Sequence, residues 1–496
     1  MSLRRNKQDV VIIGGGPAGS TAATFLAMKG YSVTLLEKEK FPRDHVGESL
    51  LPYCYKIFKE LGVLDELSKR FVRKPGVRFV DVDGSRYTTW CFGHVIKDPS
   101  YLSFHVLRAE FDKLLLDNAR KHGAIVREEA KVRGVDLDRP DGVVEVRSIG
   151  PGGEKKIHRA RFLLDASGRD TFLATRMGWK KPHKELDRAA LNTHWTGGKY
   201  IEGIEEGLLQ IVYLGGDKKG WIWVIPIGAD RLSVGVVLNH AYIRNERARF
   251  EKERVKDWRL ELYLQELMSS KFVSDILTNA KIIQPLMFNG DYSYTVEKKY
   301  GNNFALIGDA SAFIDPIFAS GVFLSINTAR LVTQALHKKF TSNNGDGDAY
   351  LKKAYEQVNG AYALVDKAIR LFYNPQSINF AQAGTAVDLI HQKHENAMAL
   401  GHYLLAGDFF ERHEQYSKFI DLLQDPKLFR RYKNYVIDRE EFQTNSCGMS
   451  RLQIFHSLLK EHKKRQAKRG RNTKAAMMKK EREGKSQKMS RKSSSV

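Results

Sequence analysis

The fold of this chain is decided by Asp9-Val10-Val11-Ile12-Ile13-Gly14-Gly15-Gly16-Pro17-Ala18-Gly19. Its first five residues read as a short buried strand, and the glycines follow with the spacing G-x-G-x-x-G. Gly14 permits a tight turn, Gly16 lets the backbone approach a pyrophosphate, and Gly19 lets helix and strand pack closely. Pro17 suits the first turn of a helix whose N-terminus would face the phosphates. The stretch therefore predicts a dinucleotide site.

A second strand-like run, from Ser32 to Leu36, follows the predicted helix and ends in Glu37. Glu37 lies about 20 residues beyond the first glycine, where such sites place the acid that holds a ribose hydroxyl. A lone G-x-G-x-x-G motif is often a chance loop. Strand, glycines, helix, strand and acid in this order favour a nucleotide-binding domain.

A downstream segment distinguishes FAD from a nicotinamide cofactor. Phe304 to Ile307 reads as an apolar strand that runs into Gly308-Asp309, and Asp315-Pro316 and Ser320-Gly321-Val322 follow. A nicotinamide fold does not need this segment, whereas the extended FAD needs a second contact. We expect the Asp309 carboxylate to bind the ribityl or pyrophosphate region, and a helix N-terminus near Gly321 to face the flavin ring.

Two further features bear on the cofactor. Arg108 opens another predicted helix, where it either contacts a phosphate or is an ordinary cation of a helix surface. Gly150-Pro151-Gly152-Gly153 lies between two strand-like runs and reads as a hairpin turn. The sequence therefore offers no second strand-glycine-helix unit for a nicotinamide cofactor.

A pair of tryptophans lies in Trp221-Ile222-Trp223-Val224-Ile225-Pro226, between strand-like runs at 208–214 and 231–238. Residues two apart on a strand point to the same face, so the two indoles would form a flat aromatic wall. They are either a barrier beside a reactive centre or a pair of core residues, since aromatic residues are common in strands.

With Phe41-Pro42-Arg43 and Gly47-Glu48-Ser49, these motifs make the chain resemble the flavin-dependent halogenases over residues 9–330. That family lies within the glutathione-reductase-like group of FAD proteins, which also holds aromatic hydroxylases and geranylgeranyl reductases. The glycine and Gly-Asp motifs are shared with the hydroxylases. The Trp-x-Trp-x-Ile-Pro stretch distinguishes the halogenases.

We accordingly expect an α/β fold: a glutathione-reductase-like FAD-binding fold, a mixed β-sheet substrate domain and a helical C-terminal part. The FAD-binding domain is predicted to be discontinuous. The expected boundaries are 1–70, 104–184 and 301–345 for FAD binding, 71–103 and 185–300 for the substrate-side sheet, 346–459 for the helical region, and 460–496 for a disordered basic tail. The helical pattern around 355–369 has apolar residues three and four apart. Phe372, Tyr373 and Phe380 either line the substrate cavity or pack in the core.

The resemblance implies a two-component enzyme. FADH2 arrives from a separate flavin reductase and reacts with oxygen to a flavin hydroperoxide, which chloride or bromide attacks to give hypohalous acid. Trp221, Trp223 and Pro226 would form the partition that keeps the organic substrate from the flavin. The halide would bind the backbone amides of Ser320 and Gly321. The residues expected to hold FAD are Gly14, Gly16, Ala18, Gly19, Glu37, Arg43, Ser49, Arg108, Asp309, Pro316, Gly321 and Val322.

In the family a lysine receives or orients the oxidant, and its match by motif position is Lys74, in Phe71-Val72-Arg73-Lys74-Pro75-Gly76. Partial burial lowers the pKa of a lysine, so that its amine can bind hypohalous acid or form a haloamine. Without the resemblance, a surface lysine before a strand would be the ordinary reading. Lysines are abundant in this chain.

One departure from the tryptophan halogenases concerns the substrate. Those enzymes carry a glutamate where this chain has Phe318, in Asp315-Pro316-Ile317-Phe318-Ala319-Ser320-Gly321. An apolar residue there resembles the branch that halogenates phenols and pyrroles, so we expect such a substrate, free or bound to an acyl or peptidyl carrier protein, rather than free tryptophan. Two alternatives remain open: a hydroxylase or prenyl-chain reductase of the same fold, and a non-catalytic flavoprotein that acts through its tail.

Composition adds limits. With 496 residues and 42% hydrophobic residues, the chain can bury large cores. Cys54, Cys91 and Cys447 show neither disulfide nor metal spacing, which favours a reducing compartment, the cytoplasm, and no metal site. The sequence contains no run of 18 apolar residues, so a membrane span is not expected. About half of the formal net charge of +23 lies in residues 460–496, whose role is either solubility or capture of an acidic carrier protein. Nucleic-acid binding is not expected, because the tail lacks aromatic residues for stacking.

Overall fold

The structure, a computed structural model, describes residues 7–94, 96, 98–183, 187–201, 204–218, 220–290, 293–342, 347–374 and 395–423. Phe380, Cys447 and the basic tail at 460–496 lie outside these residues, as does much of the predicted helical region. The chain divides into two compact units, and the fold and site below belong to the first, residues 1–388 and 401–414. The second unit contains the remaining parts of α12 (Glu395–Ala406) and α13 (His413–Leu423).

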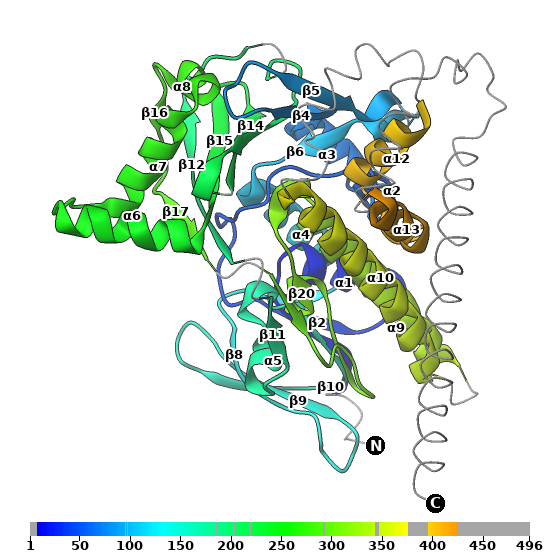
Figure 1. The fold of residues 1–496 in the computed structure, drawn as a ribbon. Coiled ribbons are helices and arrows are strands. Elements are labelled where there is room, and N and C mark those ends of the chain that lie inside the picture. Colours follow the sequence, from blue (N-terminus) through cyan, green and yellow to red (C-terminus); the bar gives the residue numbers. More distant parts are fainter. Residues whose placement is uncertain are drawn as a thin grey trace, which may run out of the picture. The chain divides into compact units, whose positions relative to one another are not determined.

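The nucleotide-side sheet contains the glycine motif (Figure 1). Its strands run in the order β7 (Ile125–Arg127), β2 (Val33–Leu36), β1 (Lys7–Ile13), β10 (Lys155–Asp165), β9 (Val144–Ile149) and β8 (Lys131–Asp136), with β19 (Phe304–Leu306) also paired to β10. Strands β7, β2, β1, β10 and β19 are parallel, whereas β9 and β8 are antiparallel. The strands predicted at 9–13, 32–36 and 304–307 are confirmed, and so is the hairpin turn at 150–153, where the Gly150 amide donates to the Glu154 carbonyl.

Four helices of this part follow the strands and pack on one another: α1 (Pro17–Met28), α4 (Arg108–Lys121), α9 (Gly321–Thr341) and α10 (Gly347–Tyr373). Helix α1 begins directly after the glycine turn, with Pro17 in its first turn. Helix α9 contacts both α1 and α10, so it lies between them. These contacts place the N-termini of α1 and α9 in one domain. None of the described helices is long and apolar enough to cross a membrane.

A second, mixed sheet carries the tryptophans and is called the tryptophan sheet below. Its strands run in the order β16 (Lys281–Ile282), β12 (Arg188–Thr196), β15 (Arg231–Asn239), β14 (Gly220–Gly228), β13 (Leu209–Leu214), β4 (Gly76–Val80) and β5 (Tyr87–Cys91), with β17 (Met287–Asn289) also paired to β12. The β13–β4 pair is parallel and the other pairs are antiparallel. The predicted mixed sheet is thus present.

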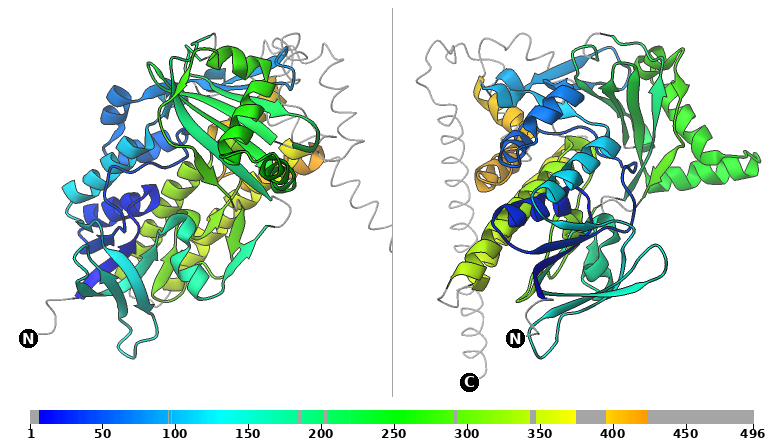
Figure 2. Two further views of the ribbon diagram at one scale, coloured as in Figure 1. Left: turned by 90° about the vertical axis from the view of Figure 1, so that its left-hand side faces the viewer. Right: turned by 180° about the vertical axis from the view of Figure 1, so that it is seen from behind.

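The stretch predicted as substrate-side sheet also contains elements that the sequence analysis did not predict. Helices α6 (His240–Lys252), α7 (Trp258–Ser269) and α8 (Lys271–Leu277) cover one face of the tryptophan sheet (Figures 1 and 2). Two small sheets are separate from it in their hydrogen bonding. In one, β3 (Val72–Lys74) pairs with β6 (Ser103–His105), and both strands contact β14; in the other, β18 (Tyr294–Val296) pairs with β11 (Lys180–Pro182) and β20 (Ala312–Phe313). The remaining short helices are α2 (Cys54–Glu60), α3 (Leu64–Arg70) and α5 (Phe172–Arg176).

The two faces of β14 bury different side chains. Ile222 and Val224 face α6, α7 and α8 and pack with Leu262 and Ile276 of those helices. Trp221 and Trp223 point to the opposite face, with ring centroids 5.6 Å apart and planes inclined by 45°. The alternation of the strand therefore separates an aliphatic core from an aromatic surface.

The indole of Trp223 lies across a glycine of the neighbouring strand. Trp223 pairs with Gly235 of β15, and a Cβ atom added at Gly235 would stand 2.2 Å from Cζ2 of the indole. The Trp223 Nε1 atom donates to the Ser233 hydroxyl at 3.1 Å. Gly235 thus provides the space into which the ring fits, and Ser233 fixes its orientation.

We expect Gly235→Ala to displace the Trp223 ring, because the new methyl group cannot share its volume. Overpacking of this kind costs about 1–3 kcal/mol. The thermal unfolding midpoint should fall and the tryptophan fluorescence should change. Gly228→Ala is the matched control, since an added Cβ there meets Arg231 at an ordinary 3.4 Å. Equal behaviour of the two variants would contradict the packing described for Trp223.

Candidate active site

A cavity of about 500 Å³ lies between the glycine turn, the start of α9 and the aromatic face of the tryptophan sheet. It brings together most of the residues singled out from the sequence. These are Gly14, Gly16, Ala18, Glu37, Arg43, Ser49, Arg108, Trp221, Trp223, Asp309, Pro316, Gly321 and Val322. Gly19, Pro226, Ser320 and Lys74 do not line it. Pro226 pairs with Leu232, which belongs to the helix-covered core, so it faces away from the cavity.

The glycines of the motif have different structural roles. Gly14 has φ +99°, and a Cβ there would lie 2.3 Å from the Ala166 carbonyl oxygen. At Gly19 a Cβ would lie 1.9 Å from the Gly14 oxygen, so these two glycines are required by the packing of the protein itself. Gly16 differs, because the nearest atom to an added Cβ is Arg43 Nη2 at 3.6 Å. The space beside Gly16 therefore opens into the cavity, as the close approach of a pyrophosphate requires.

Glu37 and Arg108 are fixed by hydrogen bonds within the protein. The Glu37 Oε2 atom accepts from the Gly15 amide at 2.6 Å, which holds the carboxylate against the glycine turn. Arg108 donates from Nε and Nη2 to the two carboxylate oxygens of Asp112, at 2.8 and 2.9 Å. Arg108 is buried, so it is not an ordinary cation of a helix surface. A guanidinium held in this way is oriented before any ligand binds.

Asp309 lies in the short turn that follows β19, and it contributes a carboxylate to the cavity wall. The Ser325 hydroxyl donates to its Oδ1 atom at 3.4 Å. Burial raises the pKa of Asp309 to about 6, although Arg169 and Arg108 act in the opposite direction. A ligand hydroxyl that donated to this carboxylate would favour its ionised form.

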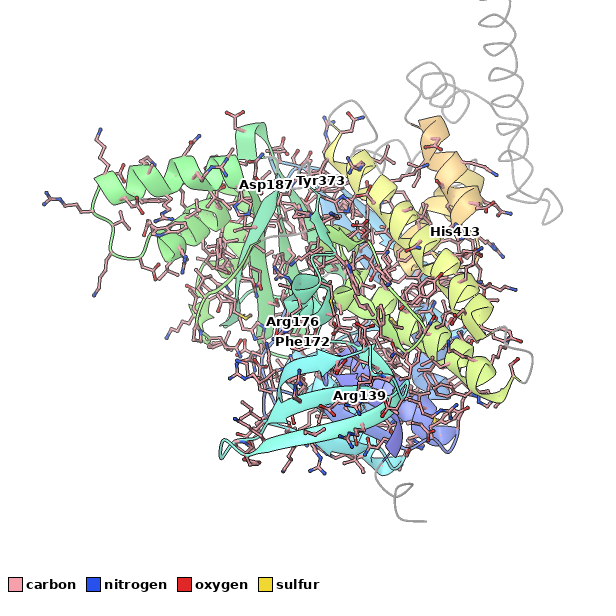
Figure 3. The ribbon with its side chains drawn as sticks, turned by 90° about the horizontal axis from the view of Figure 1, so that it is seen from below. Arg139, Phe172, Arg176, Asp187, Tyr373 and His413 are labelled. Carbon is pink, nitrogen blue, oxygen red and sulfur yellow. The ribbon has the colours of Figure 1, made fainter. Side chains whose placement is uncertain are left out.

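Several cavity residues were missed by the sequence analysis. Phe172 and Arg176 lie side by side at one end, with the guanidinium carbon 3.8 Å from the ring centroid (Figure 3). Arg169 contributes a further, half-buried cation and donates from Nη1 to Asn289 Oδ1 at 3.3 Å. The sequence signal for Arg169 was its place after Ala166-Ser167-Gly168, the turn that follows a parallel strand. Such a turn reaches the same edge of the sheet as the glycine motif.

Glu48 also lines the cavity and is part of a chain of hydrogen-bonded side chains. Its Oε1 atom lies 2.6 Å from Nε2 of His194, and the Nδ1 atom of His194 accepts from Nε of Arg231 at 3.2 Å. Because the guanidinium only donates, Nδ1 is unprotonated and Nε2 carries the proton that Glu48 accepts. Glu48 is far from both partners in the sequence, so no local pattern could have revealed the contact.

The tryptophan wall is joined to the Asp315-Pro316 segment through Tyr373 of α10. Trp221 donates from Nε1 to the Tyr373 hydroxyl at 2.8 Å, and that hydroxyl donates to Asp315 Oδ2 at 2.9 Å. Asp315 in turn accepts from the Ile317 amide at 3.1 Å. Arg188 stacks on the Tyr373 ring, 3.4 Å from its centroid. The sequence left Tyr373 as either a cavity residue or a packing residue, and its hydroxyl bonds to the wall itself.

The start of α9 shapes the cavity where the sequence analysis placed the halide. Ala319 has φ +52°, and the helix begins at Gly321. A Cβ added at Gly321 would meet nothing within 4 Å, whereas Ser320 is buried. The first amides of a helix have no partner within the helix, so they can donate hydrogen bonds to an anion.

Lys74 is buried at the end of β3, with only 1% of its surface exposed. Its Nζ atom donates to the Leu50 carbonyl at 3.0 Å and lies 5.4 Å from the Phe92 ring centroid. Burial lowers the pKa of Lys74 to about 7. Ser49, the neighbour of Leu50 in the chain, lines the cavity. The Lys74 amine is therefore hydrogen-bonded to the residue that directly follows Ser49 of the cavity wall in the chain.

Comparison with known proteins identifies the family of the chain. The family model for an FAD binding domain matches residues 7–363. Tryptophan 2-halogenase of Chondromyces crocatus is 33% identical over 389 residues, which cover 77% of this chain and 71% of that protein. The 1H-pyrrole-2-carbonyl-(peptidyl-carrier protein) chlorinase of Pseudomonas fluorescens is 30% identical over 358 residues, covering 68% and 77%.

A solved structure extends the likeness to the fold. The flavin-dependent brominase Bmp2 matches with a TM-score of 0.71 and 25% sequence identity, over 87% of this chain and 99% of that one. The residues around the cavity fit FAD, since the opening beside Gly16 leaves room for a pyrophosphate and Asp309 offers a carboxylate. The hydroxylase and the non-catalytic alternatives are thereby set aside. The chain belongs to the flavin-dependent halogenases and is an FAD-dependent enzyme.

Proposed function

We propose that this halogenase uses reduced FAD and O2 to halogenate, and chiefly to chlorinate, an electron-rich aromatic compound such as a phenol or a pyrrole. The observation that carries this proposal is the buried amine of Lys74, whose pKa of about 7 leaves a fraction of it neutral under ordinary conditions. Burying a lysine without a carboxylate partner costs stability. Such a group is typical of functional sites.

The cofactor would be held by the residues that line the cavity. Gly16 gives a pyrophosphate access to the helix N-terminus, Glu37 and Asp309 accept hydroxyl protons, and Arg43 and Arg108 oppose the phosphate charge. Bound FADH2, together with O2, a halide ion and a proton, gives FAD, hypohalous acid and water. We infer that FADH2 comes from a separate flavin reductase, because the sequence offers no second nucleotide unit.

The tryptophan wall would separate the flavin from the aromatic substrate. The indoles of Trp221 and Trp223 contribute a continuous aromatic surface to the cavity, and neither can turn freely because each Nε1 atom is hydrogen-bonded. Pro226 would act indirectly, by ending the regular register of β14. The halide, chloride or bromide, would lie against the amides of Ser320 and Gly321, where a helix N-terminus favours an anion.

The substrate proposal rests on Phe318. It is buried, and its ring contacts Phe372 edge to face at 6.3 Å. A carboxylate buried in the same place would need a hydrogen-bond partner. The apolar surroundings of Phe318 therefore suit an aromatic substrate whose ring loses its proton without the help of a carboxylate. One relative is named as a chlorinase of a pyrrole bound to a peptidyl carrier protein, which supports a pyrrole substrate on a carrier protein. The tryptophan halogenase relative makes an indole the second candidate.

Asp309→Asn tests the proposed contact with the cofactor. In the free protein the carboxyl group is largely protonated below about pH 6, because its pKa is raised above the ordinary 3.8. If a ribityl hydroxyl donates to the carboxylate, FAD affinity should rise about tenfold between pH 5 and pH 7 and level off above. Asp309→Asn should remove this dependence, as measured by fluorescence titration of FAD. Asp170→Asn, also at the cavity wall, should keep it; the opposite pattern would reject the contact.

Lys74→Ala and Lys74→Met should leave FAD affinity unchanged and lower halogenation by at least about 100-fold. Methionine keeps the volume of the side chain and removes only the amine. The measurement pairs each protein with a flavin reductase, chloride or bromide, and a panel of phenols, pyrroles and tryptophan, free or carrier-bound. Products are identified by halogen isotope patterns in mass spectrometry. Lys299→Met, which removes another lysine whose pKa burial lowers, is the control. Normal product formation by Lys74→Met would defeat the proposal.

Tyr373→Phe should loosen the tryptophan wall without weakening FAD binding. The substitution leaves Trp221 Nε1 and Asp315 without the shared hydroxyl, at a cost of about 1–3 kcal/mol. We expect more FADH2 to be oxidised for each halogenated product, with the excess recovered as hydrogen peroxide. Tyr355→Phe is the matched control, because Tyr355 lies on the same helix and donates to the Leu306 carbonyl. The interpretation fails if both variants give the wild-type ratio of product to oxidised flavin.

A further inference from the structure

Lys74 shares one face of a short ladder with three other polar residues. In the β3–β6 pair Lys74 stands opposite Ser103, and on the other side of β6 Ser49 pairs with His105. Opposed residues of an antiparallel ladder, and alternate residues along a strand, point to the same side. Ser49, Ser103, His105 and Lys74 therefore lie on one face, which is called the polar track below.

The polar track is buried, and most of its polar atoms lack partners. The exposed fractions are 5% for Ser49, 2% for Ser103, 0% for His105 and 1% for Lys74. Within the described part of the chain, the hydroxyls of Ser49 and Ser103 and the Nδ1 atom of His105 make no hydrogen bond. Each such atom costs about 1–3 kcal/mol when buried. Three such atoms on one face point to a ligand that supplies the missing bonds.

The state of His105 is determined by its anchor. Its Nε2 atom lies 2.9 Å from the Gly207 carbonyl oxygen, which only accepts, so Nε2 carries the proton and Nδ1 presents a lone pair. Burial, and then the nearby Lys74, hold the pKa of His105 well below its ordinary value. His105 thus stays neutral and Nδ1 stays an acceptor. One N–H of the Lys74 ammonium donates to the Leu50 carbonyl, which leaves two N–H groups for a ligand.

We propose that the polar track conducts hypohalous acid from the flavin cavity to Lys74, and that His105 Nδ1 and Lys74 Nζ hold the acid between them. Ser49 belongs to both the cavity wall and the track, so it marks the entry. Hypohalous acid has one O–H donor and an oxygen acceptor, which match the lone pair of His105 and the donors of Lys74. The inference rests on the proposed function of Lys74.

The arrangement also accounts for the protons of the transfer. Electrons of the aromatic ring form the carbon–halogen bond, and the oxygen–halogen bond breaks with its electron pair left on oxygen. The Lys74 ammonium protonates that oxygen, which leaves as water. The neutral amine then accepts the proton lost by the ring carbon, so the site returns to its starting state. His105 exchanges no proton in these steps and acts only as a positioning residue.

Two substitutions at one position separate this role from a structural one. His105→Gln can keep the donor to Gly207 but removes the acceptor at Nδ1, whereas His105→Asn keeps an acceptor near Nδ1 and loses the anchor. We expect His105→Gln to lower halogenated product per oxidised flavin about tenfold, and His105→Asn to retain more, a difference of about 1.4 kcal/mol. If His105 served only the fold, His105→Gln would retain more product than His105→Asn, because only glutamine keeps the hydrogen bond to Gly207.

The lost oxidant should reappear in solution. With an excess of a soluble β-diketone as trap, His105→Gln and Ser103→Ala should transfer halogen to the trap in proportion to the product lost. Thr34→Val is the control, since its hydroxyl is also buried without a partner in the described chain but lies in β2. The FAD affinity and the thermal unfolding midpoint of His105→Gln and Ser103→Ala should match those of Thr34→Val. Ser103→Ala behaving like Thr34→Val would reject the track.

A measurement on FAD-free protein completes the test. Substoichiometric hypochlorous acid should chlorinate the Lys74 amine, releasing water, and peptide mass spectrometry should find less N-chlorinated Lys74 in His105→Gln than in the wild type. Lys299 serves as the internal reference. If Lys74→Met still halogenates, the proposed function is wrong. If Lys74 is required but the His105 variants match the wild type in product, trap and N-chlorination, only the track is wrong.

Discussion

The structure depends on the burial of β14 on both faces. One face packs against α6, α7 and α8, while the other presents Trp221 and Trp223 to the cavity. A slip of one residue in register would exchange the two sets of side chains, placing indoles in an aliphatic core and aliphatic residues at the cavity. Gly235 opposes such a slip, because only a residue without a side chain accommodates the ring of Trp223.

Burial also controls the chemistry of the ionisable groups around the cavity. It shifts the pKa of Asp309 upward and that of Lys74 downward, so each group comes closer to neutrality than it would be in water. Arg108 behaves differently, because Asp112 compensates its charge within hydrogen-bond distance. Arg108 is therefore paired with a carboxylate, whereas Asp309 is held by the Ser325 hydroxyl and Lys74 by the Leu50 carbonyl.

Local signals predicted much of the fold and part of the site. The glycine turn, its flanking strands and the strand before Asp309 follow from short-range patterns, and the structure has them where expected. Helices α6, α7 and α8 were not predicted: they lie between β15 and β16 of one sheet, within a stretch that was assigned to that sheet as a whole. The bonds from Trp221 to Tyr373 and from Glu48 to His194 join residues far apart in the chain, and such contacts leave no pattern in a single sequence. Family membership came from motifs, whereas the contact of Phe318 with Phe372 joins two separate segments of the chain and leaves no such motif.

The chain crosses from β3 to β4 directly after Lys74, through Pro75, whose ring restricts the backbone. Strand β3 pairs with β6, which leads into helix α4, and β4 belongs to the tryptophan sheet. Lys74 is thus the last residue of one small sheet, and Pro75 alone separates it from the first residue of the tryptophan sheet, so its main chain is held from both sides.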